Sequence, residues 1–322
     1  MLQTTVERLL PLTPMDDVFI VGNKEHAPLF SQQVPQCDEH HLVLEPVGKN
    51  TAACIATMAF LLHRVDPDSI LLILPADHWI AKEEKFRDTL YTAAVTAFEE
   101  HAIVTLGVPP TFPSTGYGYI EVPESELTGG RKPAIFRVKR FVEKPDLKRA
   151  RAYLESGNFY WNSGIFVARS SVMLEEIGRY LPDLYAPLRE LARIPLDTLE
   201  GFLEAVYPTL PAISIDYGVM EKTKKAMMIE ADFGWSDVGS WDALYDLSSP
   251  DESGNVVEGH VLLEGCRNCL MQGGDRLIAA VGLEGVLIVD TPDAVLVLPR
   301  GRSQEVRRVV ERLKEAGLED LL

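Results

Sequence analysis

Short apolar runs that alternate with helical patterns limit the possible folds of this chain more than any other feature. Four runs in the first third have the length and composition of β-strands. They are VFIVG, LVLE, ILLIL and AIVTLG, at residues 18–22, 42–45, 70–74 and 102–107. Helices are predicted between them at residues 51–64 and 83–100, and the second carries an apolar stripe of Phe86, Leu90, Ala94 and Phe98. Strands that alternate with helices predict a doubly wound α/β domain.

Two apolar segments carry specific expectations about the core. The run ILLIL is apolar throughout, so we expect this strand to be buried on both faces. The opening MLQTTVERLLPL predicts a helix with Leu2, Val6, Leu9 and Leu10 on its apolar face, while Arg8 points elsewhere. An alternating α/β chain usually opens with a buried strand, so this first helix raises the question of what it covers.

The pattern along the chain changes twice. After Gly107, strand-like segments such as YGYIEV, IFRVKRFVEKP and FYWNSGIFVA are separated by turn residues, and several helices follow before AMMIEAD. From about residue 250 only short strands occur, until a charged helix at residues 304–316. We predict an α/β domain in residues 1–248 and a small β-rich module in residues 249–322 with stacked strands or a short β-helix.

Composition excludes some classes of function. The 31 Lys and Arg against 48 Asp and Glu give a net charge of −17, which argues against binding to nucleic acid or an anionic membrane. A small phosphorylated ligand remains compatible with this charge, because backbone N–H groups, a few lysines and a divalent metal can bind it. No signal peptide is visible, so we expect a cytoplasmic protein. Cys266 and Cys269 form a single CxxC, which we interpret as ordinary residues.

Two aspartates follow predicted strands, where ligands of open α/β sheets bind. Asp77 comes directly after ILLIL, and Asp237 lies in the Gly- and Trp-rich segment GWSDVGSW. Two carboxylates from separate loops would suit a Mg²⁺ ion that also holds phosphate oxygens. Alternatively, Asp77 is a turn or capping residue and the two aspartates are unrelated.

Other loops suit a phosphorylated sugar or nucleotide. Residues 45–51 lead from a strand into a helix N-terminus, which suits an anion or a purine edge, although any capped helix looks similar. Lys144 could contact a phosphate and Glu143 sugar hydroxyls, or the two could form a surface ion pair. Residues 115–119 and 161–164 mix aromatic, glycine and polar side chains as sugar pockets do, and as ordinary turns also can.

The order of the motifs resembles that of the mannose-1-phosphate guanylyltransferases. The motifs are EPVGKNTA, PADH, GYGYI, FVEKP, WNSGIF, SIDYGVMEK and GWSDVGSW. The resemblance covers essentially the whole chain, including the β-rich tail. It implies a Rossmann-like, doubly wound mixed sheet of the nucleotide-diphospho-sugar transferase type, with a β-helix-like C-terminal module.

The resemblance also implies a reaction and roles for individual residues. In this reaction mannose 1-phosphate attacks GTP in line, giving GDP-mannose and pyrophosphate with the help of Mg²⁺. By similarity, Asp77 and Asp237 would hold Mg²⁺, and Lys144 would hold the sugar phosphate. The implied substrate-binding residues are Glu143, Asn162, the Gly116 backbone, Tyr117 and Asp216 for mannose, and Glu45, Asn50 and Thr51 toward the nucleotide.

The resemblance has one gap, at the N-terminus. Family members begin with a strand, a Gly-Gly-x-Gly-Thr-Arg turn and a Pro-Lys pair, whereas this sequence opens on the helix that follows them. Either Met1 is an internal methionine of a longer enzyme, or the gene is short and its product binds sugar nucleotide without making it. We expect the first, and little or no activity from the chain as printed, because cationic contacts to the phosphates are missing.

Other readings of the sequence stay open. The chain could be a non-catalytic sugar-nucleotide-binding or assembly protein of the same fold, or it could serve another hexose 1-phosphate. The expected ligands are GTP and mannose 1-phosphate. The apolar strands GVLIVD and AVLVLP of the tail also make a homodimer plausible.

Overall fold

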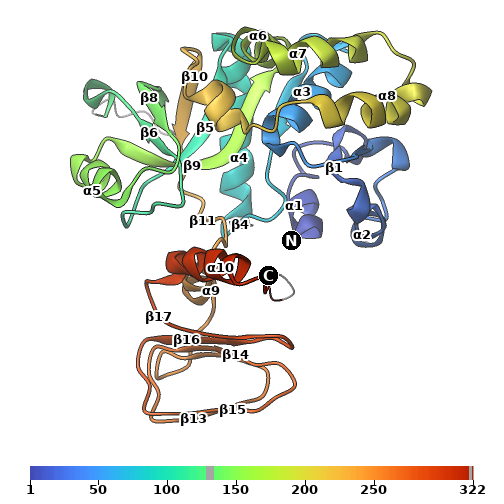
Figure 1. Cartoon of the computed structure of the whole chain (residues 1–322). Helices are drawn as coiled ribbons and strands as arrows, with labels where there is room; N and C mark the ends of the chain where they lie inside the picture. Colours follow the sequence, from blue (N-terminus) through green and yellow to red (C-terminus); the bar gives the residue numbers. More distant parts are fainter. Residues whose placement is uncertain (128–133, 319–320, 322) are drawn as a thin grey trace. The chain divides into compact units, whose positions relative to one another are not determined.

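The computed structural model describes residues 1–127, 134–318 and 321, and it divides into two compact units (Figure 1). The first unit is Met1–Trp235 and the second is Ser236–Leu322. The structure groups residues 236–248 with the second unit, because helix α9 (Trp241–Leu247) is anchored there. The predicted boundary between an α/β domain in residues 1–248 and a β-rich module in residues 249–322 stays a prediction.

A seven-stranded mixed sheet forms the centre of the first unit, as the sequence predicts. The strand order is β7-β10-β5-β9-β6-β8, with β3 paired to β9 beside this path. The strands are β3 (Ile70–Ile73), β5 (Ile103–Val108), β6 (Tyr119–Glu121), β7 (Ile135–Arg137), β8 (Arg140–Val142), β9 (Phe159–Arg169) and β10 (Ala226–Glu230). Among these described strands, only β5 and β10 run parallel as a pair, and the other pairs are antiparallel.

The long strand β9 organises this sheet. Strand β5 lies along one edge of β9, while β3 and β6 share its other edge. Strand β6 pairs with residues 159–161 of β9 and β3 with residues 166–169. Residues 162–165 therefore lie where the two neighbouring strands diverge, and such a divergence point is where α/β sheets usually bind ligands.

Helices cover both faces of the sheet, which confirms the doubly wound α/β class. One face packs against α3 (Asn50–His63), α6 (Ser170–Tyr180), α7 (Pro182–Leu188) and α8 (Leu199–Val206), and the other against α4 (Glu83–Glu100). Helix α5 (Leu147–Ser156) packs near the start of β9. The predicted stripe on α4 is confirmed at Phe86 and Leu90, which are buried, and Ala94 is half-buried against the same core cluster. The stripe is wrong at Phe98. The Phe98 ring is partly exposed and lies under the Arg169 guanidinium, 3.7 Å away.

A separate two-stranded parallel sheet contains β1 (Ile20–Asn23) and β2 (Leu42–Glu45). Helix α1 (Leu2–Glu7) contributes Val6 to its apolar cluster, and α2 (Ala27–Gln33) contributes Phe30. The prediction for the first helix is wrong at two positions, because Leu10 is exposed and Arg8 is buried.

The expectation that the ILLIL strand is buried on both faces is also wrong. Only Leu71 of β3 is buried, and the other apolar residues of this strand are half-buried. The reason is the pairing: β3 pairs with β9 on one side, and among the described residues no strand pairs with its other edge. This arrangement makes β3 an edge strand with an apolar sequence.

The second unit is a short β-helix-like coil. Its strands are β12 (Val256–Glu258), β13 (Val261–Glu264), β14 (Leu270–Gln272), β15 (Ile278–Val281), β16 (Val286–Asp290) and β17 (Val295–Pro299). Val261 pairs with Ile278 and Leu270 with Leu287, each 17 positions apart, whereas Val256 pairs with Leu270, 14 positions apart. Cys266 and Cys269 lie buried inside the coil, where their thiols donate to backbone carbonyls. Helix α10 (Val306–Glu315) follows β17.

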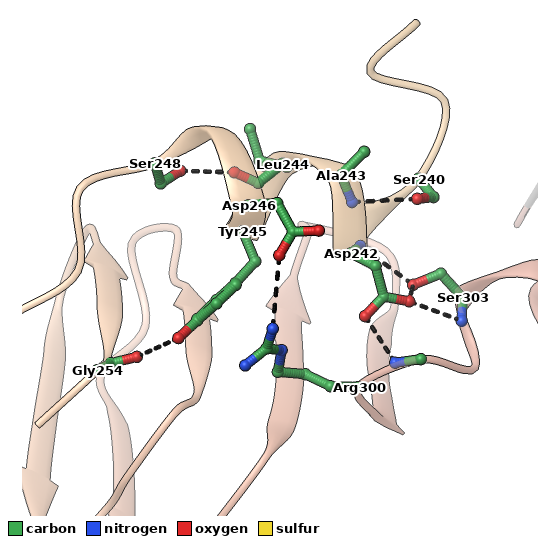
Figure 2. A network of polar contacts seen from close by, with 11 residues as sticks. Ser240, Asp242, Ala243, Leu244, Tyr245, Asp246, Ser248, Gly254, Arg300 and Ser303 are labelled. Atoms are coloured by element: carbon green, nitrogen blue, oxygen red, sulfur yellow. Dashed lines mark hydrogen bonds and ion pairs between the residues drawn. The ribbon is translucent and has the colours of Figure 1, made fainter. Parts of the chain in front are cut away.

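Polar contacts attach α9 to this coil (Figure 2). The Asp242 carboxylate accepts hydrogen bonds from the amides of Gly301 and Ser303 at 2.7 and 3.2 Å. Tyr245 donates its hydroxyl to the Gly254 carbonyl, and Ser240 caps the helix by accepting from the amide of Ala243. These bonds join the segment after Trp235 to the C-terminal coil.

Across the described residues, no helix is both long and apolar enough to cross a membrane.

Candidate functional site

The turn that carries Asp77 follows β3 and is held by the first helix. Thr5 Oγ1 donates to the carbonyl of Ala76 at 3.1 Å, and Arg8 Nη1 donates to the carbonyl of His78 at 3.1 Å. Both donors are buried, whereas Asp77 is exposed. Helix α1 and Arg8, which follows it directly, thus fix the backbone on both sides of Asp77 and leave Asp77 accessible.

A row of aromatic rings runs from this turn toward β9. Trp235 Nε1 donates to His78 Nδ1 at 3.1 Å, and because an indole N–H can only donate, Nδ1 must be the acceptor. The Tyr117 ring lies 5.5 Å from the Trp235 ring and 5.0 Å from that of Trp161. These contacts connect the Asp77 turn with the start of β9 inside the first unit.

Asn162 occupies the divergence point of β9 and is buried. Its Nδ2 donates to Asp216 Oδ1 at 3.0 Å, and its Oδ1 lies 2.9 Å from Thr105 Oγ1 of β5. Asp216 begins a single π-helical turn, Asp216–Met220. Burial raises the pKa of Asp216, although Lys144 and Asn162 favour its ionised form. A contact of Asp216 with the sugar stays a prediction.

Glu143 and Lys144 complete the same cluster. Lys144 Nζ lies 3.1 Å from Glu143 Oε1, and the amide of Glu143 donates to Glu221 Oε1 at 2.9 Å. Burial and the nearby Asp216 carboxylate raise the pKa of Glu143, while Lys144 opposes this shift. A Cβ at Gly118 would lie 2.5 Å from Glu143 Oε2, so the absence of a side chain at Gly118 leaves room for this carboxylate.

The backbone at Lys144 also has an uncommon conformation. Its φ is +44°, in the left-handed region that non-glycine residues seldom adopt. Such residues are concentrated at functional sites, where neighbouring contacts hold them. The structure therefore brings Glu143, Lys144, Asn162 and Asp216 together, with two carboxylates, an amide and an ammonium group at one place.

Glu45, Asn50 and Thr51, which were predicted to lie toward the nucleotide, each accept a hydrogen bond from another group of the protein. The Thr51 hydroxyl accepts a hydrogen bond from the amide of Ile215 at 2.9 Å, one residue before Asp216. Asn50 Oδ1 accepts from the amide of Thr51 at 2.8 Å, and α3 begins at Asn50 without a side-chain cap. Glu45 accepts a hydrogen bond from the buried Tyr207 hydroxyl. The roles of Glu45, Asn50 and Thr51 toward a nucleotide stay predictions.

Gly116 and Tyr117 lie in the turn before β6. The amide of Gly116 donates to Ser114 Oγ at 3.1 Å, so this N–H already has an acceptor in the turn. Tyr117 belongs to the aromatic row, where it contacts Trp161 and Trp235. Contacts of Gly116 or Tyr117 with mannose stay predictions.

Asp237 belongs to the second unit, whereas Asp77 belongs to the first. Asp237 Oδ1 accepts a hydrogen bond from the amide of Gly239 at 3.1 Å, and Val238 in the same turn has a φ of +49°. Among residues 1–127 and 134–318, the structure contains no group of three or more His, Cys, Asp or Glu side chains arranged for a metal ion. The convergence of Asp77 and Asp237 on one ion stays a prediction.

Sequence reasoning missed four residues that support this region: Thr5, Arg8, Thr105 and Glu221. A signal for Thr105 existed, because it is the one polar side chain in the apolar strand AIVTLG. Glu221 lies in the motif SIDYGVMEK but has no distinguishing pattern of its own. Arg8 was assigned to the polar side of its helix, and only the packing of that helix shows otherwise.

Comparison with known proteins identifies the family. Residues 1–254 match the nucleotidyl transferase family, and residues 258–313 match the MannoseP isomerase/GMP-like beta-helix domain. The chain belongs to the nucleotidyl transferase family. It is 41% identical to the putative mannose-1-phosphate guanylyltransferase of Vibrio cholerae over 98% of its own length and 67% of that protein. It is 40% identical to a mannose-1-phosphate guanylyltransferase of Escherichia coli, with the same coverage of both chains.

A solved structure agrees with this assignment. The mannose-1-phosphate geranyltransferase from Thermus thermophilus aligns with 97% of this chain and 89% of its own, with a TM-score of 0.80 and 36% identity. The match confirms the nucleotidyltransferase fold and the β-helix-like C-terminal part. The protein is therefore a nucleotidyltransferase of the sugar-nucleotide class, and it spans about two thirds of the length of the curated relatives it matches.

Proposed function

We propose that this site serves guanylyl transfer from GTP to mannose 1-phosphate, giving GDP-mannose and pyrophosphate. The observation that carries the proposal is the cluster of Glu143, Lys144, Asn162 and Asp216 at the divergence point of β9. Carboxylates and an amide can bind sugar hydroxyls, and the Lys144 ammonium can bind the sugar phosphate. The names of the relatives support mannose and guanosine as the partners.

We further propose that Asp77 and Asp237 hold the Mg²⁺ ion of the reaction. Asp77 fits this role because it offers a hard oxygen ligand from an exposed position on a fixed turn. When bound, the ion would neutralise charge on the phosphate groups. The residues of the chain supply the rest: Lys144 orients the sugar phosphate, and the buried Asn162 orients the sugar ring by hydrogen bonding.

Calorimetric titration tests the ligand class directly. We expect GDP-mannose and mannose 1-phosphate to bind the chain in the presence of Mg²⁺, and GDP-mannose to bind more tightly than the adenosine and uridine diphosphate sugars. Lys144→Ala should weaken mannose 1-phosphate binding by about tenfold or more, because it removes a charge-assisted contact. Lys148→Ala, which changes an exposed lysine of α5, is the matched control. Equal affinity for every sugar nucleotide would refute the proposed specificity.

The metal assignment has its own test. In a form of the enzyme that turns over, Asp77→Asn or Asp237→Asn should abolish the Mg²⁺-dependent release of pyrophosphate without lowering the melting temperature. Asp88→Asn on the exposed face of α4 is the control, and it should leave the rate unchanged. An unchanged rate in Asp77→Asn or Asp237→Asn would remove that residue from the metal site.

A further inference from the structure

Thr105 lies at an irregular point of the sheet and is completely buried. The pairing of β5 with β9 shifts register between Thr105 and Gly107, and Asn162 faces this bulge from β9. The Thr105 hydroxyl lies 2.9 Å from Asn162 Oδ1 and 3.0 Å from the carbonyl oxygen of Ile165. Bulges often re-aim a side chain near a functional site.

The hydrogen-bond count restricts how these groups can pair. A threonine hydroxyl has one proton, whereas Asn162 Oδ1 and the Ile165 carbonyl can only accept. Thr105 therefore donates to one of them at a time. When it donates to Asn162 Oδ1, the amide is oriented with its Nδ2 toward Asp216, which is the arrangement observed at 3.0 Å.

If the Asn162 amide were turned so that its nitrogen and oxygen exchanged places, its hydrogen bonds would have to change. Asn162 Nδ2 would then donate to Thr105, Thr105 would donate to Ile165, and Asn162 Oδ1 would face the Asp216 carboxylate. Two acceptors facing each other are unfavourable unless one of them carries a proton. When Asp216 is ionised, its carboxylate and the Thr105 hydroxyl thus favour the same orientation from the two sides of the amide.

We propose that Thr105 is a positioning residue that fixes the amide of Asn162, so that this side chain presents an N–H donor and not a carbonyl to the sugar ligand. Asn162 Nδ2 has two protons, and Asp216 takes only one of them. The second proton is the donor that we assign to a sugar hydroxyl. This last step depends on the proposed function, whereas the orientation of the amide does not.

An experiment on the free protein tests the orientation. The full chain is labelled with ¹⁵N-asparagine, and the Nδ2 signals of Asn162 are identified by their loss in Asn162→Asp. We expect Thr105→Val to shift or double these signals, because the amide loses its donor, and Thr105→Ser to leave them in place. Thr96→Val is the matched control, because Thr96 is also buried but donates only to a carbonyl of its own helix. Unchanged Asn162 signals in Thr105→Val would overturn the proposal.

The affinity for mannose 1-phosphate then tests whether this orientation of the Asn162 amide contributes to ligand binding. We expect Thr105→Val to weaken mannose 1-phosphate binding by about tenfold, with Thr105→Ser within about twofold of the unmodified chain. If Thr105→Val does not fold, Thr105→Ala is measured in its place. Altered signals with unchanged affinity would overturn the positioning role. If the unmodified chain binds no mannose 1-phosphate, the proposed function fails, while the resonance experiment still decides the orientation.

Discussion

Replacing Tyr207 by Phe should destabilise the first unit by an amount that depends on pH. The Tyr207 side chain is 1% exposed, and its hydroxyl donates to Glu45, which precedes the loop into α3. Burial and the Glu45 carboxylate raise the pKa of Tyr207, so its hydroxyl stays a donor. A hydrogen bond to a charged group contributes about 1.5–3 kcal/mol, and one to a neutral group about 0.5–1.5 kcal/mol.

The sign of the pH dependence follows from the pKa of Glu45. Burial raises this pKa above the value in the unfolded chain, and the Tyr207 hydrogen bond opposes the increase. A carboxyl group with a raised pKa contributes most stability at low pH, and the contribution is lost as pH rises from the unfolded to the folded pKa. Tyr207→Phe removes the opposing bond, so the loss of stability should be larger at pH 7.5 than at pH 4.5.

Urea unfolding at the two pH values measures this difference. We expect Tyr207→Phe to lower the free energy of unfolding by about 2 kcal/mol at pH 7.5 and by about 1 kcal/mol at pH 4.5. Tyr119→Phe is the matched control, because the fully buried Tyr119 donates to the neutral carbonyl of Ser114 at 2.9 Å. Tyr119→Phe should lower the free energy of unfolding by the same amount at both pH values. A cost of Tyr207→Phe that does not change with pH would refute the reasoning.

Three further predictions concern the framework around the site. Burial acts to raise the pKa of Glu121, but Lys139 and Arg140 outweigh it and hold this pKa below its ordinary value. Glu121→Gln should therefore lower the free energy of unfolding by about 1 kcal/mol at pH 7, and by progressively less as pH falls through the folded pKa. Urea unfolding measures this difference. Arg8→Ala should lower the melting temperature and accelerate amide hydrogen exchange in residues 76–79, and unchanged exchange there would contradict the role of Arg8 in holding this turn. The apolar edge of β3 should promote association, so sedimentation should show larger species as concentration rises, whereas a monomer throughout would count against it.

Local periodicity predicted the elements of this fold well where they are long or bounded by clear turns. The predicted strand at residues 42–45 and helix at residues 83–100 coincide with β2 and α4. Strand β14, Leu270–Gln272, has no local signal in the sequence, because its three residues follow the CxxC directly and are too few to show a period. The burial of β3 was wrong for a different reason, since an apolar run does not reveal whether a strand has neighbours on both edges.

The grouping of the site residues follows from the topology and not from local pattern. Glu143, Asn162 and Asp216 come from three distant segments, and they meet because β6 and β3 share one edge of β9 and leave residues 162–165 between them. Sequence motifs assigned these residues through a family resemblance. The motifs do not include Thr105, because its role depends on a bulge that places its hydroxyl opposite Asn162.

Thr51 shows why a residue type alone does not determine a role. A threonine at the start of a helix can cap the helix, bind a ligand or hold another segment, because one hydroxyl oxygen suits all three. Here the Thr51 oxygen accepts from the amide of Ile215, and the amide of Ala52 donates to the carbonyl of Ile213 at 3.1 Å. The start of α3 therefore holds the segment that leads to Asp216. This coupling connects the predicted nucleotide side of the site with the sugar side through two hydrogen bonds, so a ligand that moves the α3 N-terminus would also move Asp216.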